Sequence, residues 1–507
     1  MTTVFQSEPL GSEADRDSDK DYTARASRTN YRGAKSRPPG KFTSKPKPSK
    51  RQRPLNRELV LGGLGRWAPL QTLEGVQELV SDLVGEPLDF DALYSMSMRD
   101  LKTWFLDQGF HLQGGFTKSA LIEQYLNAQS EKDSLHLKLY GVLEPLGNGD
   151  ACLVYERDCY ELRAMSAFVP ACLIEHCGLK RGHVVTVRAL PPCEGASCPI
   201  AVSIDAVMGK PPQIACQKVP FEDLTPIYPQ ERILLSSKHD QEDSIAMRLI
   251  DLVAPIGLGQ RGLIVAPPRV GKTMVLKSIA RAIAAHRPEA KLMVLLIDEC
   301  PLEVTEFCRQ VKGEVVYSSF DQSAEKHVHA AEMVIHKARR LVEVGQDVVI
   351  LLDSMTRLAR AYNAVTPSSG KVLPSGLDAS ALDRPKRFFG AARNIEGGGS
   401  LTILATALVD TGSAVDAAIF EEFKAVCNME LYLDPKLAEA RVFPAINIEK
   451  SGTCREELLY HPDELRKIYT LRRTLLHDTS SQAVQLFLKH LASTDSNVTF
   501  LSHLSDG

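Results

Sequence analysis

The chain has 507 residues, 44% of them hydrophobic, and a formal net charge of −3. It exceeds the size at which one hydrophobic core stops growing, so several domains are expected. No apolar run approaches the roughly 20 residues that cross a bilayer, and the N-terminus has early acids instead of an apolar signal segment, so neither a membrane-spanning nor a secreted protein is expected. Eleven scattered cysteines favour reduced thiols and a cytoplasmic location.

The first 57 residues contain most of the charge asymmetry. Residues 1–23 carry a net charge of −4, and residues 24–57 carry twelve Lys or Arg and no acid, which leaves −11 on the other 450 residues. The low apolar content of residues 1–57 predicts a disordered tail. A basic arm beside an acidic body indicates a polyanion partner, most often nucleic acid; the alternative is a solvated tail that only aids solubility.

Helical spacing follows the arm, over residues 58–132. Apolar residues lie on one helix face between Leu70 and Val84. Further helices are predicted over Phe90–Gln108 and Lys118–Ala128, separated by the glycines of GFHLQGGF. We therefore expect a small all-helical N-terminal region.

Residues 136–220 have a different pattern. Short alternating or β-branched runs, such as HVVTVRAL and PIAVSIDAV, are separated by turn signals and predict a small β-barrel. Seven of the eleven cysteines lie in this region, including two C-x4-C pairs, Cys172/Cys177 and Cys193/Cys198. A zinc site is one interpretation; unligated thiols are favoured, because structural zinc modules use the tighter C-x2-C spacing.

The C-terminal region, residues 241–507, follows a linker predicted over 221–240. Its apolar strands GLIVA, KLMVLLIDE, DVVILLDS and SLTILATAL alternate with helical stretches. Strands that are apolar throughout are buried on both faces, and with helices between them they predict a parallel sheet in an α/β domain.

The sequence APPRVGKT at Ala266–Thr273 follows the strand GLIVA and opens a helix. This is the context of a phosphate-binding loop, because backbone N–H groups at a helix N-terminus bind phosphate oxygens. Lys272 is expected to reach the β- and γ-phosphates, and the Thr273 hydroxyl to bind Mg²⁺. The chain is therefore predicted to bind a nucleoside triphosphate with magnesium.

Two acidic strand ends accompany the loop. Asp353 ends DVVILLD and is expected to hold magnesium through water or Thr273. Glu299 ends KLMVLLIDE and is the candidate base for the attacking water; its alternative is a surface acid at a strand end. Together with the loop, these acids predict hydrolysis. Downstream, Phe443 either stacks on a base or, as is commoner for such an aromatic, lies in the core.

From about Asp251 onward the chain resembles the family of the bacterial transcription termination factor Rho. The resemblance rests on long strings: DLVAPIGLGQRGLIVAPPRVGKT, LLDSMTRLARAYN, SGKVLPSGLDASALDRPKRFFGAARN, SLTILATALVDTGS and RVFPAI. The upstream helices and barrel lie where that family carries its N-terminal helices and its cold-shock-type OB domain. The resemblance covers most of residues 86–507 and leaves the basic arm outside.

The resemblance implies a multidomain fold: a Rho N-terminal-like module from about residue 86, an OB/cold-shock-type RNA-binding domain over 136–220, and a RecA-like P-loop ATPase domain with C-terminal helices over 241–507. It further implies a cytoplasmic homohexameric ring with nucleotide sites between subunits. Such a ring binds nascent RNA, moves 5′ to 3′ along it using ATP and Mg²⁺, and releases it from RNA polymerase and its elongation factors. No membrane partner is implied.

The family's functional residues transfer to matching positions of this chain. The implied catalytic residues are Lys272, Thr273, Glu299, Asp353, Arg357 and Arg455, with magnesium held by Thr273 and Asp353. The implied nucleotide-binding residues are Gly257, Leu258, Gly259, Gln260, Arg261, Gly262, Arg269, Val270, Gly271, Lys272, Thr273, Met274, Cys300 and Phe443. The implied RNA contacts are Phe168 in the barrel, Ser369, Gly370 and Lys371 in a pore loop at Pro367–Gly376, and Ala414 in a second pore loop at Asp410–Asp416.

Several positions depart from the family pattern. The arginine finger lies in an SGTR-type string, but this string ends in Cys454 here, and a thiol cannot supply the positive fork of an arginine. Fingers of this kind are worth roughly 10³–10⁵ in rate. Arg455 is next in line if the loop shifts by one residue. Cys300 stands where a second arginine is expected, and Ala414 where a lysine is usual.

The barrel also departs from the family. The stretch Gly149–Val154 lacks the aromatic pair on which bases stack in the family, a contact worth about 1–3 kcal/mol per base. Phe168 retains one expected aromatic position, and Cys198 replaces another. Either the barrel binds RNA differently, or the basic arm takes over part of RNA loading through phosphate contacts.

Three functions are compatible with this sequence. The leading one is an ATP-driven RNA translocase that terminates transcription, indicated by the intact loop, both carboxylates and Lys371. The second is a nucleotide-binding RNA ring with weak or lost hydrolysis, indicated by Cys454, Cys300 and Ala414. The third, a protein-remodelling motor of the same ring class, is less favoured because the SGK pore loop resembles that of Rho.

Overall fold

A computed structural model describes residues 68–503, apart from 82, 84, 111–116, 130–134, 164, 193–197, 216–217, 237–243, 368–375, 379 and 477–480. The basic arm and the predicted pore-loop residues Ser369, Gly370 and Lys371 therefore lie outside the described residues. The described residues belong to one compact unit. Across the described ranges, no helix combines the length and apolar character needed to span a bilayer.

The N-terminal part is helical where the sequence predicts helices. Its elements are the 3₁₀ helix η1 (Ala68–Gln71), α2 (Leu73–Ser81), the short strand β1 (Leu88–Asp89), α3 (Phe90–Ser95), α4 (Met98–Asp107) and α5 (Lys118–Gln129). The Asp89 side chain caps α3 by accepting from the backbone N–H of Ala92 at 3.0 Å, and Ser97 caps α4 in the same way. That these helices form the family's N-terminal module stays a prediction.

A closed barrel follows, as the alternating pattern predicts. Its strands are β2 (Leu137–Pro145), β3 (Ala151–Val154), β4 (Phe168–Val169), β5 (Val184–Leu190) and β6 (Ile200–Val207), with η2 (Glu156–Asp158) and α6 (Ala171–His176) between them and α7 (Pro212–Ala215) after them. The hydrogen-bonded order is β2-β3-β4-β6-β5, and β5 pairs back onto β2. Closure removes the free strand edges of this small sheet.

The C-terminal region forms a mainly parallel sheet in the order β12-β11-β13-β15-β10-β16-β17. The strands are β10 (Arg261–Ala266), β11 (Lys291–Glu299), β12 (Glu314–Ser319), β13 (Val348–Asp353), β15 (Ser400–Leu408), β16 (Met429–Tyr432) and β17 (Gly452–Thr453). Short strands β7 (Pro226–Ile227) and β14 (Arg393–Ile395) extend the sheet beside β15, and β8 (Arg232–Ile233) pairs with β9 (Ile256–Gly257). The α/β prediction is confirmed.

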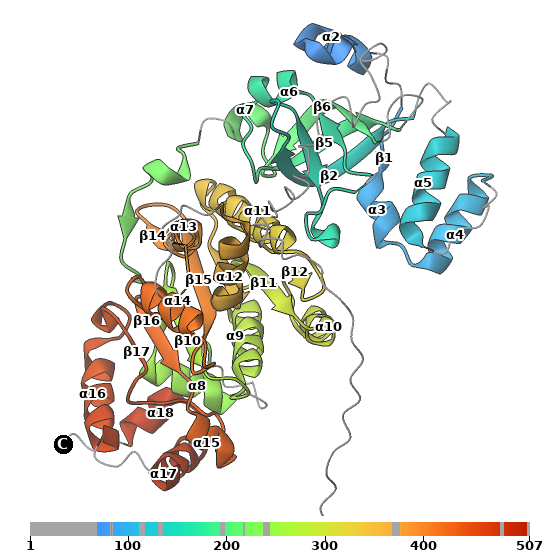
Figure 1. Ribbon diagram of the computed structural model, residues 1–507. Coiled ribbons are helices and arrows are strands. Elements are labelled where there is room, and N and C mark those ends of the chain that lie inside the picture. The colour runs from blue at the N-terminus through green and yellow to red at the C-terminus, as the bar shows by residue number, and fades with distance from the viewer. Residues whose placement is uncertain are drawn as a thin grey trace, which may run out of the picture. The chain divides into compact units, whose positions relative to one another are not determined.

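Helices connect these strands and follow them (Figure 1). They are α8 (Ser244–Val253), α9 (Lys272–His286), α10 (Pro301–Gln310), α11 (Ala324–Glu343), α12 (Met355–Val365), α13 (Asp383–Phe389), α14 (Ala414–Lys424), α15 (Pro435–Glu439), α16 (Pro462–Leu476), α17 (Ser481–Ala492) and α18 (Asn497–Ser502), with the 3₁₀ helices η3 (Phe221–Asp223) and η4 (Glu456–Leu458).

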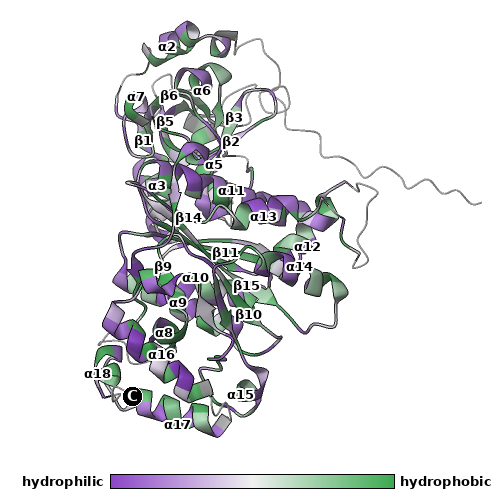
Figure 2. Cartoon of the chain, turned by 90° about the vertical axis from the view of Figure 1, so that its left-hand side faces the viewer, coloured by the Kyte–Doolittle hydropathy of each residue, from purple (hydrophilic) through white to green (hydrophobic). Residues whose placement is uncertain are grey.

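The strands of this sheet contribute to a core on each face. Within β11, Val294 and Leu296 belong to the core beneath α8, α9 and the C-terminal helices, whereas Leu295 and Ile297 belong to the core beneath α11 and α12. Successive strand residues point to opposite faces, so a strand covered on both sides is apolar at every position. Figure 2 shows this for β10, β11 and β15, which are largely hydrophobic.

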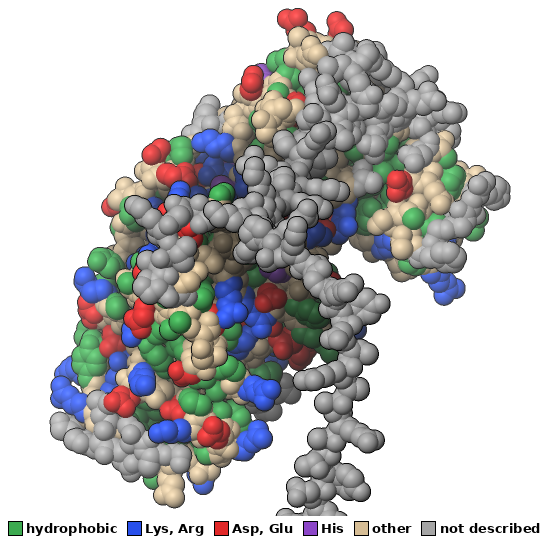
Figure 3. Space-filling model, in the orientation of Figure 1, with side chains coloured by type: hydrophobic (Ala, Val, Ile, Leu, Met, Phe, Trp, Pro, Cys, Tyr) green, Lys and Arg blue, Asp and Glu red, His purple; other side chains and the backbone are tan. Residues whose placement is uncertain are grey.

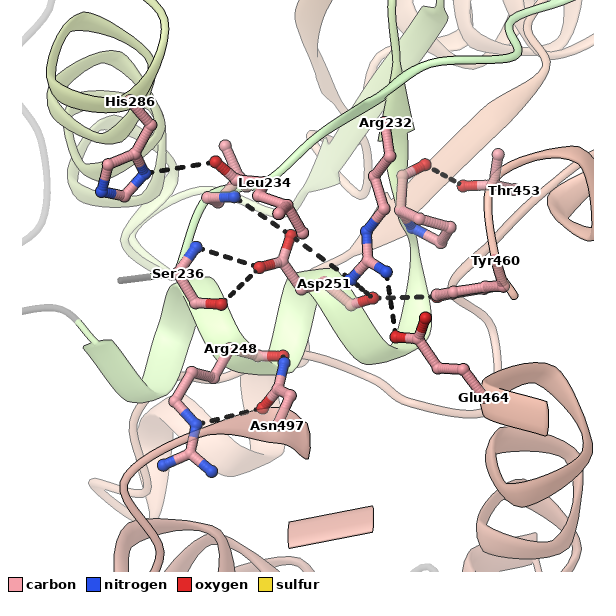
Figure 4. Close-up of polar contacts among 12 residues, drawn as sticks. Arg232, Leu234, Ser236, Arg248, Asp251, His286, Thr453, Tyr460, Glu464 and Asn497 are labelled. Atoms are coloured by element: carbon pink, nitrogen blue, oxygen red, sulfur yellow. Dashed lines mark hydrogen bonds and ion pairs between the residues drawn. The ribbon is translucent and has the colours of Figure 1, made fainter. Parts of the chain in front are cut away.

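The segment that enters this sheet is fastened to α8. The buried Asp251 carboxylate accepts from the backbone N–H groups of Leu235 at 3.2 Å and Ser236 at 2.9 Å. Arg232 donates to the Asp251 carbonyl at 2.8 Å and to Glu464 of α16 at 3.0 Å (Figure 4). Burial raises the pKa of Asp251, although Arg232 and these hydrogen bonds oppose the shift. Residues 232–236 of the predicted linker are therefore held against α8 and α16.

Candidate nucleotide site

The phosphate-binding loop has the predicted strand–loop–helix context. Strand β10 ends at Ala266, and helix α9 begins at Lys272 with Gly271 as its N-cap. Gly271 has φ +93° and Arg269 has φ +66°, backbone angles that favour glycine and are rare for other residues. The turn directs the free N–H groups of the first helical turn toward an anion.

Lys272 meets both predicted carboxylates. Its Nζ lies 2.8 Å from Glu299 Oε1 and 2.6 Å from Asp353 Oδ1. Asp353 is fully buried, and the hydroxyl of Thr406 on β15 donates to its Oδ1 at 2.7 Å. Acids from the ends of two parallel strands thus contact the first residue of α9, and Thr406 of a third strand bonds to one of them. The carboxyl ends of parallel strands share one edge of the sheet, which brings these residues together.

Burial and the neighbouring charges shift the protonation of Glu299. Burial, followed by repulsion from Asp353, raises the pKa of Glu299 to about 7, while Lys272 and Arg357 act in the opposite direction. Burial works to lower the pKa of Lys272, but the charges of Asp353 and Glu299 outweigh it and raise that pKa. A carboxyl group that titrates near neutrality is suited to accept a proton from water.

A bulge in β11 turns Glu299 toward Lys272. Ile297 pairs with Ser318 of β12 and Glu299 with Ser319, so Asp298 is the extra residue between two consecutive partners. Asp298 has φ +58°. Bulges of this kind re-aim side chains near active sites. Arg357 of α12 lies beside both acids, 3.5 Å from Glu299 and 3.8 Å from Asp298.

Sequence reasoning missed Thr406 and the bulge at Asp298. Thr406 is a hydroxyl residue inside the apolar string SLTILATAL, and a buried polar group needs a hydrogen-bond partner; that mismatch was the signal. The sequence contains no comparable signal for the bulge. Asp298 is one of two consecutive acids at the strand end, and the sequence alone does not indicate which of them faces the phosphate loop.

The stretch Gly257–Gly262 lies at the other end of β10. It precedes and opens this six-residue strand, whereas the phosphate loop follows its last residue. Six strand residues span about 20 Å. Gly257–Gly262 and Arg269–Met274 of one chain therefore lie at opposite ends of β10, and the expectation that both stretches line a nucleotide site between subunits stays a prediction. Gly259 has φ +90°, and a Cβ there would lie 2.2 Å from the backbone nitrogen of Asn394.

The finger-position residues share this far end with Gly257–Gly262. The Cys454 N–H donates to the carbonyl of Asn428 at 2.8 Å, and the Gln260 side chain donates to the same carbonyl at 3.0 Å. The Thr453 hydroxyl donates to the carbonyl of Pro255 at 2.7 Å (Figure 4). Cys454 and Arg455 are therefore remote from Lys272 of their own chain.

Arg455 is partly exposed and held in place. Its guanidinium lies 5.0 Å from the centre of the Tyr228 ring and 2.5 Å from the Glu457 carboxylate. The residue itself has φ +58°. A cation–π contact with Tyr228 and an ion pair with Glu457 thus hold this cation next to Cys454.

The other predicted nucleotide residues have mixed environments. Leu258, Gln260 and Val270 are buried, and Cys300 is half-buried as the N-cap of α10. Met274 and Phe443 are 55% and 57% exposed. For Phe443 this excludes a core position. Its backbone neighbour Ala445 accepts from Asp434 just beyond β16, at the same end of the sheet as the phosphate loop.

In the barrel, Phe168 is fully buried. The sequence predicts that the Phe168 ring contacts RNA. The structure contradicts this, because a ring buried in the barrel core has no exposed face on which a base can stack. Cys152 and Cys198 are buried as well, and burial raises the pKa of Cys198 to about 12. The stretch Asp410–Asp416, predicted as a second pore loop, lies within the described residues, and Ala414 is exposed in the first turn of α14.

The zinc interpretation of the barrel gains no support from the part of the chain that the structure describes. No group of three or more His, Cys, Asp or Glu residues is placed there to hold a metal ion. Cys193 lies outside the described residues, so the Cys193/Cys198 pair stays untested.

Comparison with known proteins gives a consistent result. A model of the ATP synthase alpha/beta family nucleotide-binding domain matches residues 246–453. The transcription termination factor Rho of Allochromatium vinosum is 50% identical over 394 residues, which are 77% of this chain and 93% of that protein. The Rho of Pseudomonas aeruginosa is 51% identical over 364 residues, 72% of this chain and 87% of that one. The Rho of Buchnera aphidicola is 47% identical over 413 residues, which are 82% of this chain and 98% of that protein.

Among solved structures, an ATPase from the type III secretion system of pathogenic bacteria matches 51% of this chain and 72% of its own, with 25% identity and a TM-score of 0.44.

Proposed function

The chain belongs to the family of transcription termination factor Rho, and we propose from this membership and from the site that it terminates transcription as an ATP-driven RNA translocase. Identity near 50% over 93% of a Rho protein carries the membership. The ATP-binding domain is that of the matched nucleotide-binding family. ATP hydrolysis coupled to 5′ to 3′ movement on RNA, followed by release of the transcript from RNA polymerase and its elongation factors in the cytoplasm, is the proposed activity.

The observation that carries the enzymatic part is the convergence of Lys272, Glu299 and Asp353. All three side chains are present and in contact. A ring that only bound nucleotide would not need a base with a pKa near 7 beside the loop lysine. The alternative of weak or lost hydrolysis, prompted by Cys454, is therefore not favoured.

In the proposed mechanism Lys272 exchanges its carboxylate contacts for phosphate oxygens when ATP binds. Glu299 is then freed to orient a water molecule and accept its proton. Thr273 Oγ1 and Asp353 Oδ2, 3.5 Å apart, are hard oxygen donors of the kind that Mg²⁺ prefers, so the residues fit this ion. Bound magnesium would neutralise the phosphate charge that develops during hydrolysis.

A homohexameric ring is proposed because one chain carries two half-sites at opposite ends of β10. Gly257–Gly262 and Arg455 at one end would complete the nucleotide site that Lys272 builds at the other end of the next subunit. Head-to-tail contact of this kind closes into a ring when the rotation closes. Arg455 is proposed to supply in trans the cation that Cys454 cannot.

RNA contacts are proposed for the ring centre and for the basic arm. Ser369, Gly370 and Lys371 belong to the first pore loop, and Ala414 to the second. The face in Figure 3 has acidic and basic side chains intermixed over the ATPase region, whereas the arm concentrates twelve cations without an acid. The arm is therefore the stronger candidate for phosphate contacts during loading.

The direct test is ATP hydrolysis by the purified chain with and without single-stranded RNA. Lys272→Ala is the inactive comparison, and Lys489→Ala, an exposed lysine of α17, is the matched control that should hydrolyse normally. We expect hydrolysis that RNA stimulates. No hydrolysis by the unaltered chain would overturn the enzymatic proposal, and hydrolysis that RNA leaves unchanged would overturn the RNA-motor proposal.

A further inference from the structure

A buried serine–histidine pair lies directly behind the bulge that aims Glu299. Ser318, near the end of β12, is 1% exposed, and His327, in the first turns of α11, is 7% exposed. The Ser318 Oγ lies 2.6 Å from His327 Nδ1 and 2.7 Å from Gln322 Oε1. None of the nucleotide-site contacts described above uses this pair.

The hydrogen bonds define which ring nitrogen carries the proton. The Ser318 hydroxyl has one proton and donates it to Gln322 Oε1, so its oxygen accepts from His327 Nδ1–H. Burial lowers the pKa of His327, which favours the neutral ring. The charged groups that act on His327 are Asp298 from β11, which raises its pKa, and Arg357 from α12, which lowers it.

The pair anchors the strand that sets the register of the bulge. Ser318 and Ser319 are the consecutive β12 partners of Ile297 and Glu299. The Phe320 N–H also donates to the carbonyl of Glu299 at 3.3 Å. Because the Ser318 side chain is tied to α11 through His327, the end of β12 cannot slide along β11 without breaking that bond. Glu299 keeps its direction only while this end of β12 stays in place.

We propose that His327 is a positioning residue for ATP hydrolysis, which holds Glu299 on Lys272 by fixing Ser318 and the bulge at Asp298. The inference rests on the proposed role of Glu299 as the catalytic base. His327 touches neither of the two catalytic groups; it acts through β12. ATP binding by the phosphate loop is independent of it, because that loop is built on β10 and α9.

The test compares His327→Asn, His327→Gln and His327→Ala with Ser318→Ala. Asparagine places an amide N–H where Nδ1–H lies, whereas glutamine places its amide near Nε2. We expect His327→Asn to keep kcat within about threefold. The other three variants should lose about ten- to a hundredfold in kcat, the cost of a misplaced catalytic group, with KM for ATP little changed. His336→Ala, on the same helix and paired with Glu332, is the control that keeps full activity.

A second readout does not need activity. In a crystal structure of His327→Ala, the proposal expects Ser318 and Ser319 to shift and the 2.8 Å contact between Lys272 and Glu299 to be lost. An unchanged contact, or equal kcat in the asparagine and alanine variants, overturns the positioning role. If the unaltered chain hydrolyses no ATP while the structural shift is seen, the proposed function fails, and only the conclusion that His327 positions the Glu299 side chain stands. Melting temperatures identify any variant that has merely unfolded. If the His327 variants unfold, the kcat of Ser318→Ala tests the positioning role.

Discussion

Lys272 Nζ and Glu299 Oε1 meet at 2.8 Å although 27 residues separate them in the chain. The lysine follows strand β10 and the phosphate loop, and the acid follows the bulge at the end of strand β11. Asp353 holds the same ammonium group at 2.6 Å. In the proposed mechanism, the lysine moves to phosphate before the acid acts on water.

Removing the charge of Glu299 separates binding from chemistry. In Glu299→Gln we expect kcat to fall about 10²–10⁴-fold, because general-base assistance is lost. ATP binding should be equal or tighter, since Lys272 loses one competing carboxylate. Single-turnover hydrolysis and equilibrium binding of a fluorescent ATP analogue measure the two effects. Glu303→Gln, in the first turn of α10, is the control; a similar loss there would argue against a specific role for Glu299.

The pH profile should report the raised pKa of Glu299. Its pKa lies near 7, above its ordinary value, so the carboxyl group is protonated and inactive as a base below that pH. We expect kcat/KM to rise with pH and level off above about 7, because kcat/KM reports groups of the free enzyme. Measurements from pH 5.5 to 9 suffice. A profile that is flat across pH 7 in the unaltered chain would contradict this assignment.

Mixed rings test whether Arg455 acts on the neighbouring subunit. Lys272→Ala and Arg455→Ala rings should each be nearly inactive. After mixing and reassembly, about one quarter of random interfaces pair an intact Lys272 with an intact Arg455 from the next subunit. We expect ATP hydrolysis to return toward that fraction. No recovery in rings shown to have exchanged subunits would mean that Arg455 does not act in trans.

Deleting residues 24–57 tests the arm. The deletion removes twelve cations, so RNA affinity should fall and the slope of log Kd against log salt should flatten, because each phosphate contact contributes about 0.7 to that slope for single strands. Deletion of residues 1–23, which carry a net −4, is the matched control and should not flatten the slope. An unchanged slope in the first deletion would show that the arm makes no phosphate contacts with RNA.

The fold and half of the site were predictable because their signals are local. The string APPRVGKT between a strand and a helix predicts the loop, and apolar strands that end in Asp353 and Glu299 predict the shared acidic edge. Periodicity alone also predicts the barrel and the parallel sheet.

The remaining features depend on long-range geometry. Gly257–Gly262 is only a few residues from the phosphate loop in sequence, yet a strand lies between them and carries them to opposite ends of the sheet. Phe168 matches an aromatic position of the family, but barrel closure buries it. The Ser318–His327 pair joins two elements that no spacing rule connects. Each of these follows from packing partners that are distant in the chain.

The measurement that tests the account most directly is release of labelled transcript from stalled, immobilised RNA polymerase. With ATP, the unaltered chain should release RNA, whereas Glu299→Gln should bind both ATP and RNA and release none. Release that proceeds equally with Glu299→Gln, or an unaltered chain that hydrolyses ATP on RNA yet leaves every transcript bound, would contradict the proposal that hydrolysis at Lys272 and Glu299 drives termination.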